Sequence, residues 1–187
     1  MARLFSIRPG ITLKGRKFKG LRGFAGKPFH PPLTDIPVAA YTMLAVFDVI
    51  SYVLNDWSLA RELFTAGTYV LIFGLVATIP TALTGFWDWL KSTPKRTQAR
   101  RTANWHMAVM LTATGLALID LIMRQGVGSR EPATLAITIV SVVVGALVAF
   151  GATYGGSLVY DYGFNVETSG DHPVWHESEE DVFPGKH

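Results

Sequence analysis

The sequence predicts an all-α integral membrane protein, an up-down four-helix bundle with extended tails before and after it. Of its 187 residues, 49% are hydrophobic and only 17% are charged, which is too apolar for an ordinary soluble domain. Four apolar segments each reach the roughly 20 helical residues that cross a bilayer. The connections at 56–62 and 124–132 are short, so successive helices should be antiparallel neighbours.

The expected boundaries follow from hydropathy and charge. Strand-like alternation is absent, and open strands in lipid leave backbone groups unpaired, so helices are expected. A basic N-terminal arm covers 1–35, a transmembrane domain 36–155 and an acidic tail 156–187. The four spans are expected near 36–55, 63–87, 103–123 and 133–155.

Three local features refine these helices. In the fourth span, small residues recur every four positions and predict close approach of a neighbouring helix. They are Ser141, Gly145, Ala149 and Thr153. Pro80 predicts a kink late in the second span, because proline removes a backbone donor.

The distribution of positive charge predicts the orientation. The first 34 residues carry eight Lys or Arg and no acid, and five more lie in the 88–102 loop. The two opposite loops carry only Arg61, Arg124 and Arg130. By the positive-inside rule, both termini and the 88–102 loop should be cytoplasmic. No apolar stretch precedes residue 36, so no secretory signal is expected.

The residue types present exclude several kinds of site. Without cysteine there is no disulfide, thiolate iron–sulfur site or covalently attached haem, so histidine, carboxylate or carbonyl must hold any metal. No nucleophile–base arrangement or phosphate-binding loop is evident, which argues against a hydrolase or kinase. The sequence therefore leaves catalysis open and favours a protein that is not an enzyme.

Five polar residues should gather at the cytoplasmic face of an up-down bundle. They are His30, Asp35, Asp88, His106 and Asp161. One interpretation is a cofactor site in which His106 and His30 ligate haem b, or a metal ion with a carboxylate such as Asp88. The other is a structural histidine hydrogen-bonded to Asp88 or to a backbone carbonyl. A quinone or lipid contact also remains open.

The segment HPPLTDIP precedes the first apolar run. Its adjacent prolines should stop any earlier helix, Thr34 or Asp35 can cap the new one, and Pro37 fits its first turn. His30 would then lie outside the regular helix, and capping gives it no role.

Intramembrane acids are candidates for function because a carboxylate in lipid is unfavourable. Asp48 and Asp120 lie within the apolar runs of two parallel helices. Asp120 and Arg124 are four residues apart and should pair on one helix face, whereas Arg61 or water is expected to reach Asp48. A proton pathway or small transporter is the rival interpretation, weakened by the lack of a clear internal repeat or broken helices.

Both tails carry candidate interaction residues. The basic arm suits anionic lipid headgroups or an acidic partner and, in a membrane context, not nucleic acid. Its docking candidates are Lys14, Arg16, Lys17, Lys19 and Arg22. The acidic tail contains His172 and His176 beside five acids, where a solvated tail is favoured over a divalent metal site.

The chain resembles the DUF2231 family of predicted bacterial membrane proteins. The similarity is carried, in order, by HPPLTDIP, Asp48 in FDVIS, TALTGFWDW, His106 and Arg124 around the third span, and GGSLVYDYGFNV, together spanning 30–166. The resemblance implies four helices, the bacterial cytoplasmic membrane and, through Rieske or cytochrome c fusions in some members, company with electron transport. The family usually has Asn four residues after the third-span histidine, where this chain has Met110.

Two functions follow as hypotheses. The first is a non-enzymatic accessory or assembly subunit of a larger membrane complex, with the charged tails as docking surfaces. The resemblance implies that this complex is respiratory. The second is a redox carrier that binds haem b or quinone near the cytoplasmic face through His106 and His30.

Overall fold

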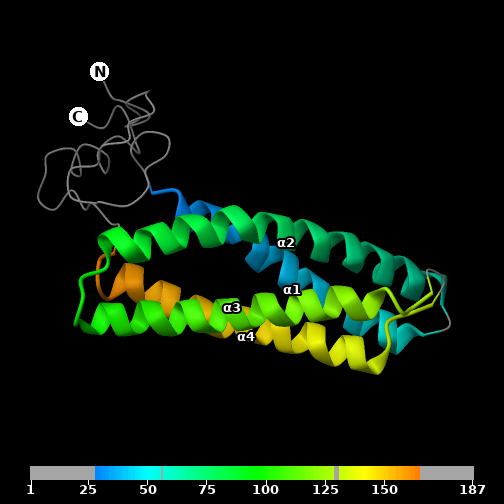
Figure 1. The fold of residues 1–187 in the computed structure, drawn as a ribbon. Coiled ribbons are helices and arrows are strands. Elements are labelled where there is room, and N and C mark those ends of the chain that lie inside the picture. The colour runs from blue at the N-terminus through cyan, green and yellow to red at the C-terminus, as the bar shows by residue number, and fades with distance from the viewer. Residues whose placement is uncertain (1–27, 56, 129–130, 165–187) are drawn as a thin grey trace, which may run out of the picture.

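Four long helices form an antiparallel bundle (Figure 1). The computed structural model describes residues 28–55, 57–128 and 131–164, and within these ranges it contains no strand. The helices are α1 (His30–Leu54), α2 (Ser58–Ser92), α3 (Gln98–Arg124) and α4 (Leu135–Tyr160). Each is long and apolar enough to cross a membrane. The all-α, four-span architecture predicted from hydropathy is confirmed.

The first helix begins earlier than expected. α1 starts at His30, with no side-chain cap and with proline as its second and third residues. The expectation that Thr34 or Asp35 caps the helix is therefore wrong, as is the placement of His30 outside it. Proline is tolerated at this position because the first helical N–H groups have no intrahelical acceptor. The hydroxyl of Thr34 instead donates to the Pro31 carbonyl at 2.6 Å.

The starts of α3 and α4 follow ordinary capping, whereas α2 begins after Trp57 without a side-chain cap. The hydroxyl of Thr97 accepts a hydrogen bond from the N–H of Arg100 at the start of α3. Thr134 accepts likewise from Ile137 at the start of α4. α2 runs on through Pro80 as one helix, and the kink expected there stays a prediction.

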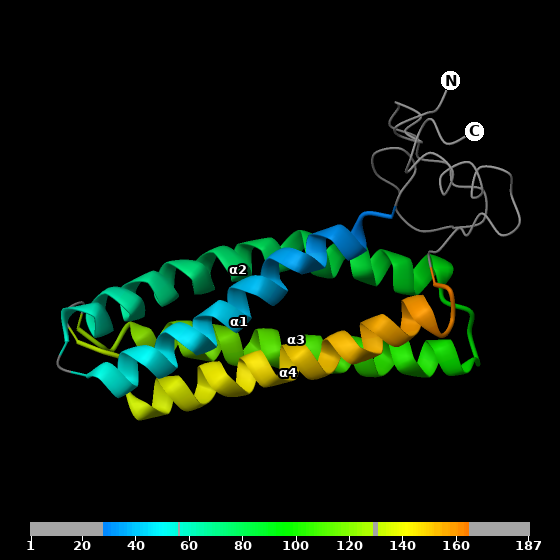
Figure 2. The same ribbon diagram turned by 180° about the vertical axis from the view of Figure 1, so that it is seen from behind.

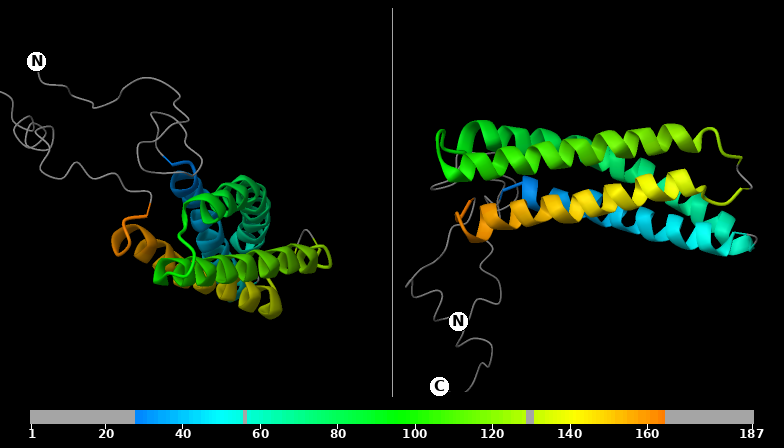
Figure 3. Two further views of the ribbon diagram at one scale, coloured as in Figure 1. Left: turned by 60° about the vertical axis from the view of Figure 1, so that its left-hand side comes forward. Right: turned by 90° about the horizontal axis from the view of Figure 1, so that it is seen from below.

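The bundle consists of two helix hairpins, α1 with α2 and α3 with α4. These pairs make the most extensive contacts, α1 with α4 fewer and α2 with α3 fewer still; Figures 2 and 3 show the hairpins from behind and from two further sides. A Cβ on Gly74 of α2 would lie 2.8 Å from Ala40 Cβ of α1. A Cβ on Gly145 of α4 would lie 3.2 Å from Ala45 Cβ. The close approach expected on the small face of α4 is therefore present at Gly145, against α1.

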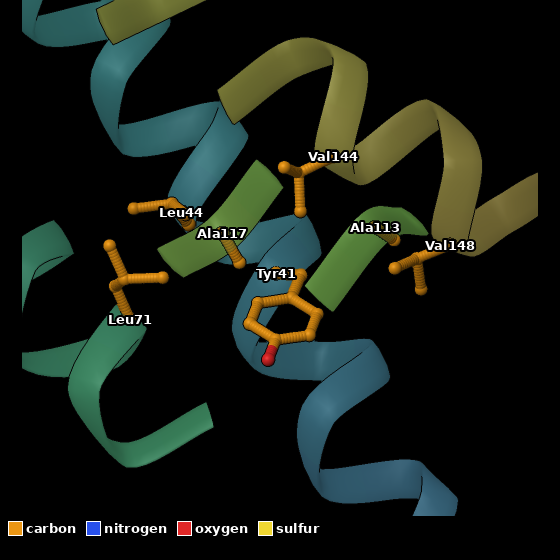
Figure 4. Close-up of a cluster of buried hydrophobic side chains, with 7 residues drawn as sticks. All are labelled: Tyr41, Leu44, Leu71, Ala113, Ala117, Val144 and Val148. Carbon is orange, nitrogen blue, oxygen red and sulfur yellow. The ribbon is translucent and has the colours of Figure 1, made fainter. Parts of the chain in front are cut away.

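A compact apolar cluster fills the centre of the bundle (Figure 4). Its members are Tyr41, Leu44, Leu71, Ala113, Ala117, Val144 and Val148. Large apolar side chains also cover the outside, as Val53, Tyr69 and Ile122, each about 70% exposed, illustrate. Such an apolar exterior suits lipid, and packing within the bundle therefore depends on small residues and polar contacts.

Candidate functional site

Two histidines face each other at the end of the bundle where α1 and α3 begin and α2 and α4 end, here called the terminal end. His30 is the first residue of α1, and His106 lies about two turns inside α3. Their ring centroids are 6.4 Å apart and their planes are nearly perpendicular, at 83°. Both side chains are half-buried. The structure thus brings together two residues that are 76 positions apart in the sequence.

Each histidine is held by a backbone carbonyl of the neighbouring helix. His30 Nδ1 lies 3.0 Å from the Thr81 carbonyl oxygen, and His106 Nδ1 lies 2.9 Å from that of Gly151. A carbonyl oxygen only accepts, so both Nδ1 atoms carry the proton and donate. In the neutral imidazole Nε2 then keeps its lone pair and is free to accept a hydrogen bond or bind a metal. Asp88 and a backbone carbonyl were the two hydrogen-bond partners predicted for a structural histidine, and the structure shows a carbonyl.

A glycine lies against each ring, one turn beyond the carbonyl that the ring binds. A Cβ on Gly85 would lie 2.6 Å from His30 Cε1, and a Cβ on Gly155 would lie 3.3 Å from His106 Cε1. Gly85 follows Thr81 by four residues, and Gly155 follows Gly151 by four. The two hairpins therefore repeat one arrangement: a histidine, a carbonyl and a glycine. This repeat in packing was not anticipated from the sequence.

The three carboxylates expected at this end lie in different settings. Asp88 of α2 is buried, at 2% exposed, and has interactions of its own. Asp35 is exposed, and so is Asp161, the C-cap residue of α4. Within the described ranges, no group of three or more His, Asp or Glu side chains is arranged to hold a metal ion. A metal between the rings would thus have two protein ligands from this part of the chain.

Sequence reasoning missed two packing features near the rings. Met110 packs against α4: a Cβ on Gly151 would lie 3.0 Å from its Cε. Arg100 stacks 3.6 Å over the Trp89 ring and donates to the Trp89 carbonyl, while Trp89 Nε1 donates to Asn104 Oδ1. These contacts tie the end of α2 to the start of α3.

A second polar cluster, here called the triad, consists of Asp48, Asp120 and Arg124. All three are at most 4% exposed. The Arg124 guanidinium donates from Nη2 to Asp48 Oδ2 and from Nε to Asp120 Oδ1, the latter at 3.0 Å. The pair expected between Asp120 and Arg124 is therefore present. The expected partner of Asp48 was wrong, because Arg124 pairs with it while Arg61 is exposed.

The triad lies at the opposite end from the histidines, here called the loop end. His30 and Asp48 are 18 residues apart on α1, and His106 and Arg124 are 18 residues apart on α3. At 1.5 Å per residue the two sites are separated by about 27 Å along the helices. This is close to the thickness of a bilayer's hydrocarbon core, about 30 Å.

The remaining candidates fall on residues that the structure does not describe. The five basic docking candidates of the N-terminal arm lie before residue 28, and the two tail histidines lie after residue 164. Their roles stay predictions.

A four-helix bundle with an apolar exterior and polar groups at both ends defines a multi-pass membrane protein. The chain belongs to the DUF2231 family of predicted membrane proteins, whose family model matches residues 26–168 and so contains all four helices. Neither the curated proteins nor the solved structures yield a match to it.

Proposed function

We propose that the protein is a membrane redox protein in which His30 and His106 ligate the iron of a b-type haem at the terminal end. The observation that carries the proposal is the 6.4 Å separation of the two ring centroids. Imidazole nitrogens bind metals at about 2.0–2.1 Å. Adding the distance from nitrogen to ring centre, two imidazoles on opposite sides of one metal have centroids about 6.3 Å apart. The observed ring separation is therefore compatible with both imidazoles binding one metal ion.

The number of protein ligands favours haem over a bare metal ion. A zinc or copper site made only of protein atoms needs three or four ligands, and the described residues offer two histidines without a third. Haem brings four nitrogens of its own and takes its axial ligands from the protein. The haem would supply one-electron transfer within the membrane.

The surroundings of the rings support ligation by Nε2. Metal-binding histidines almost always donate their other ring N–H to a carbonyl or carboxylate, which sets the tautomer and the ring orientation. Thr81 and Gly151 provide these carbonyls here. The chain would therefore hold both imidazoles in the ligating tautomer.

The accessory-subunit hypothesis is the second candidate. It is supported by the opposite charges of the two ends of the chain, with eight basic residues among the first 34 and seven acids from 161 onward. Such surfaces suit docking to lipid headgroups or to a larger membrane complex. This hypothesis requires no chromophore.

An absorption spectrum of the detergent-purified protein, oxidised and then reduced with dithionite, tests the proposal. We expect sharp reduced haem bands near one haem per chain. They should be lost in His30→Ala and His106→Ala and kept in the matched control His176→Ala. A featureless spectrum of protein purified from cells with an adequate haem supply would overturn the proposal and favour the accessory-subunit hypothesis. Proteins that co-purify with the chain would then be identified.

A further inference from the structure

The triad at the loop end has an unbalanced charge. Two carboxylates share one guanidinium, so with both acids ionised the group carries a net charge of −1. The helices packed around it add only neutral groups in the described part of the chain. α2 contributes the Thr68 hydroxyl and the Phe64 carbonyl, both bound to the guanidinium. α4 contributes the hydroxyls of Thr138 and Ser141, which donate to backbone carbonyls.

The triad also contains two buried oxygens that accept no well-aligned hydrogen bond, although the Ser141 hydroxyl lies close enough to interact with the Asp48 carboxylate. They are Asp48 Oδ1 and Asp120 Oδ2, one on each carboxylate, and both residues are 0% exposed. A buried ionised oxygen without a donor is strongly unfavourable in an apolar medium. A proton on one of these oxygens would neutralise the net charge and turn that acid into a hydrogen-bond donor.

We infer that the Asp48–Arg124–Asp120 triad holds one exchangeable proton, shared by the two carboxylates. The inference is independent of haem binding, because the triad lies about 27 Å from the histidines along the helices. It makes the loop end a proton-binding site of the membrane domain. The bond that forms and breaks is the O–H bond of a carboxylic acid, and the proton exchanges with water.

The loop end is the nearer end of the bundle for proton exchange with water, because Arg124 is the last residue of α3. An open depression there is lined by residues from the end of α1 and from the loop between α3 and α4, including Tyr52, Asn55, Val127 and Ala133. Ser51 follows Asp48 by three residues on α1 and contacts Ala133 of this lining. The Ser51 hydroxyl donates to the Ala60 carbonyl at 2.6 Å and accepts from the Ala133 N–H at 2.9 Å.

Thermal unfolding of the full-length protein at several pH values tests the inference. Above about pH 5 an unfolded chain has lost the protons of both aspartates. If the folded triad keeps one, the folded state binds one more proton than the unfolded state, so stability falls as pH rises. One proton corresponds to a tenfold change in the unfolding equilibrium constant per pH unit.

Neutral variants provide the comparison. Asp48→Asn and Asp120→Asn each leave one carboxylate and one guanidinium, so the triad is balanced without a proton. In both variants the tenfold change of the unfolding equilibrium constant per pH unit that the bound proton causes in the wild type should be absent. Glu62→Gln, which removes an exposed acid near the start of α2, should keep the wild-type slope. Parallel profiles for wild type and both Asn variants would overturn the inference.

Infrared spectroscopy of the wild type keeps the inference testable if the variants do not fold. The carbonyl stretch of a protonated carboxylic acid should be present at neutral pH. Its absence would contradict a bound proton. A bound sodium ion is the alternative way to neutralise the triad. A melting temperature that rises with Na⁺ at constant pH and ionic strength would mean that the triad binds that cation, and would overturn the inference of a bound proton.

Discussion

The rings of His30 and His106 lie 6.4 Å apart, and each is held by a carbonyl oxygen of the other helix in its own hairpin. The equivalent hydrogen bonds and the equivalent glycines make this pair a built feature of the bundle. Membrane interiors offer few polar partners. Two histidines with the same tautomer at one end of the bundle are therefore the candidate ligand-binding site of this protein.

The glycine beside His30 gives the first prediction. In Gly85→Ala the new Cβ would meet His30 Cε1 at 2.6 Å, so the imidazole must leave its position. We expect the reduced absorption spectrum to lose most of its haem bands, while the melting temperature stays nearly unchanged. Gly115→Ala on α3, with open space around its Cβ, is the matched control. Full haem content in Gly85→Ala would contradict the assignment of His30 as a ligand.

Removal of the shared guanidinium gives the second prediction. Arg124→Gln leaves the two buried aspartates without their cation, and breaking a buried ion pair in this way costs about 3–5 kcal/mol. The free energy of unfolding, measured in mixed micelles with denaturing detergent, should fall by this amount. Arg61→Gln, which alters an exposed arginine, should change it by less than about 0.5 kcal/mol. Equal stability of the two variants would show that the triad is not a structural element.

The contact between α1 and α2 gives the third prediction. A Cβ at position 74 would lie 2.8 Å from Ala40 Cβ, a contact between rigid groups. Gly74→Ala should therefore destabilise the bundle by about 1–3 kcal/mol through overpacking. Gly145→Ala, where the corresponding distance is 3.2 Å, should have a smaller effect. The ranking of the two melting temperatures checks the packing of α1 against α2 and α4.

Orientation in the membrane gives the fourth prediction, and the absence of cysteine makes it easy to test. Lys95→Cys lies in the turn between α2 and α3, and Gln125→Cys lies at the end of α3; both native side chains are exposed. By the positive-inside rule, Gln125→Cys in intact cells should react with a membrane-impermeant maleimide. Lys95→Cys should react only after permeabilisation. The reverse pattern would invert the proposed topology.

The number of helices and their order of crossing were predictable from the sequence. Hydropathy is a local property, and four apolar stretches of sufficient length leave helices as the only economical structure in lipid. The pair formed by Asp120 and Arg124 was predictable for the same reason, because residues four apart share a helix face.

Helix ends were less predictable. The prolines after Phe29 read equally well as a stop or as a first turn, and the structure uses them as a first turn. That one difference moves His30 from a connecting segment into α1 and toward His106.

Contacts between helices depended on the tertiary structure. The partners of Asp48 and of the two histidines come from 45 to 76 residues away, and no local pattern encodes which carbonyl or guanidinium will be in reach. Composition and periodicity specify each helix and its apolar surface. The close approaches at glycine, together with the unfavourable burial of unpaired polar groups, select which faces meet.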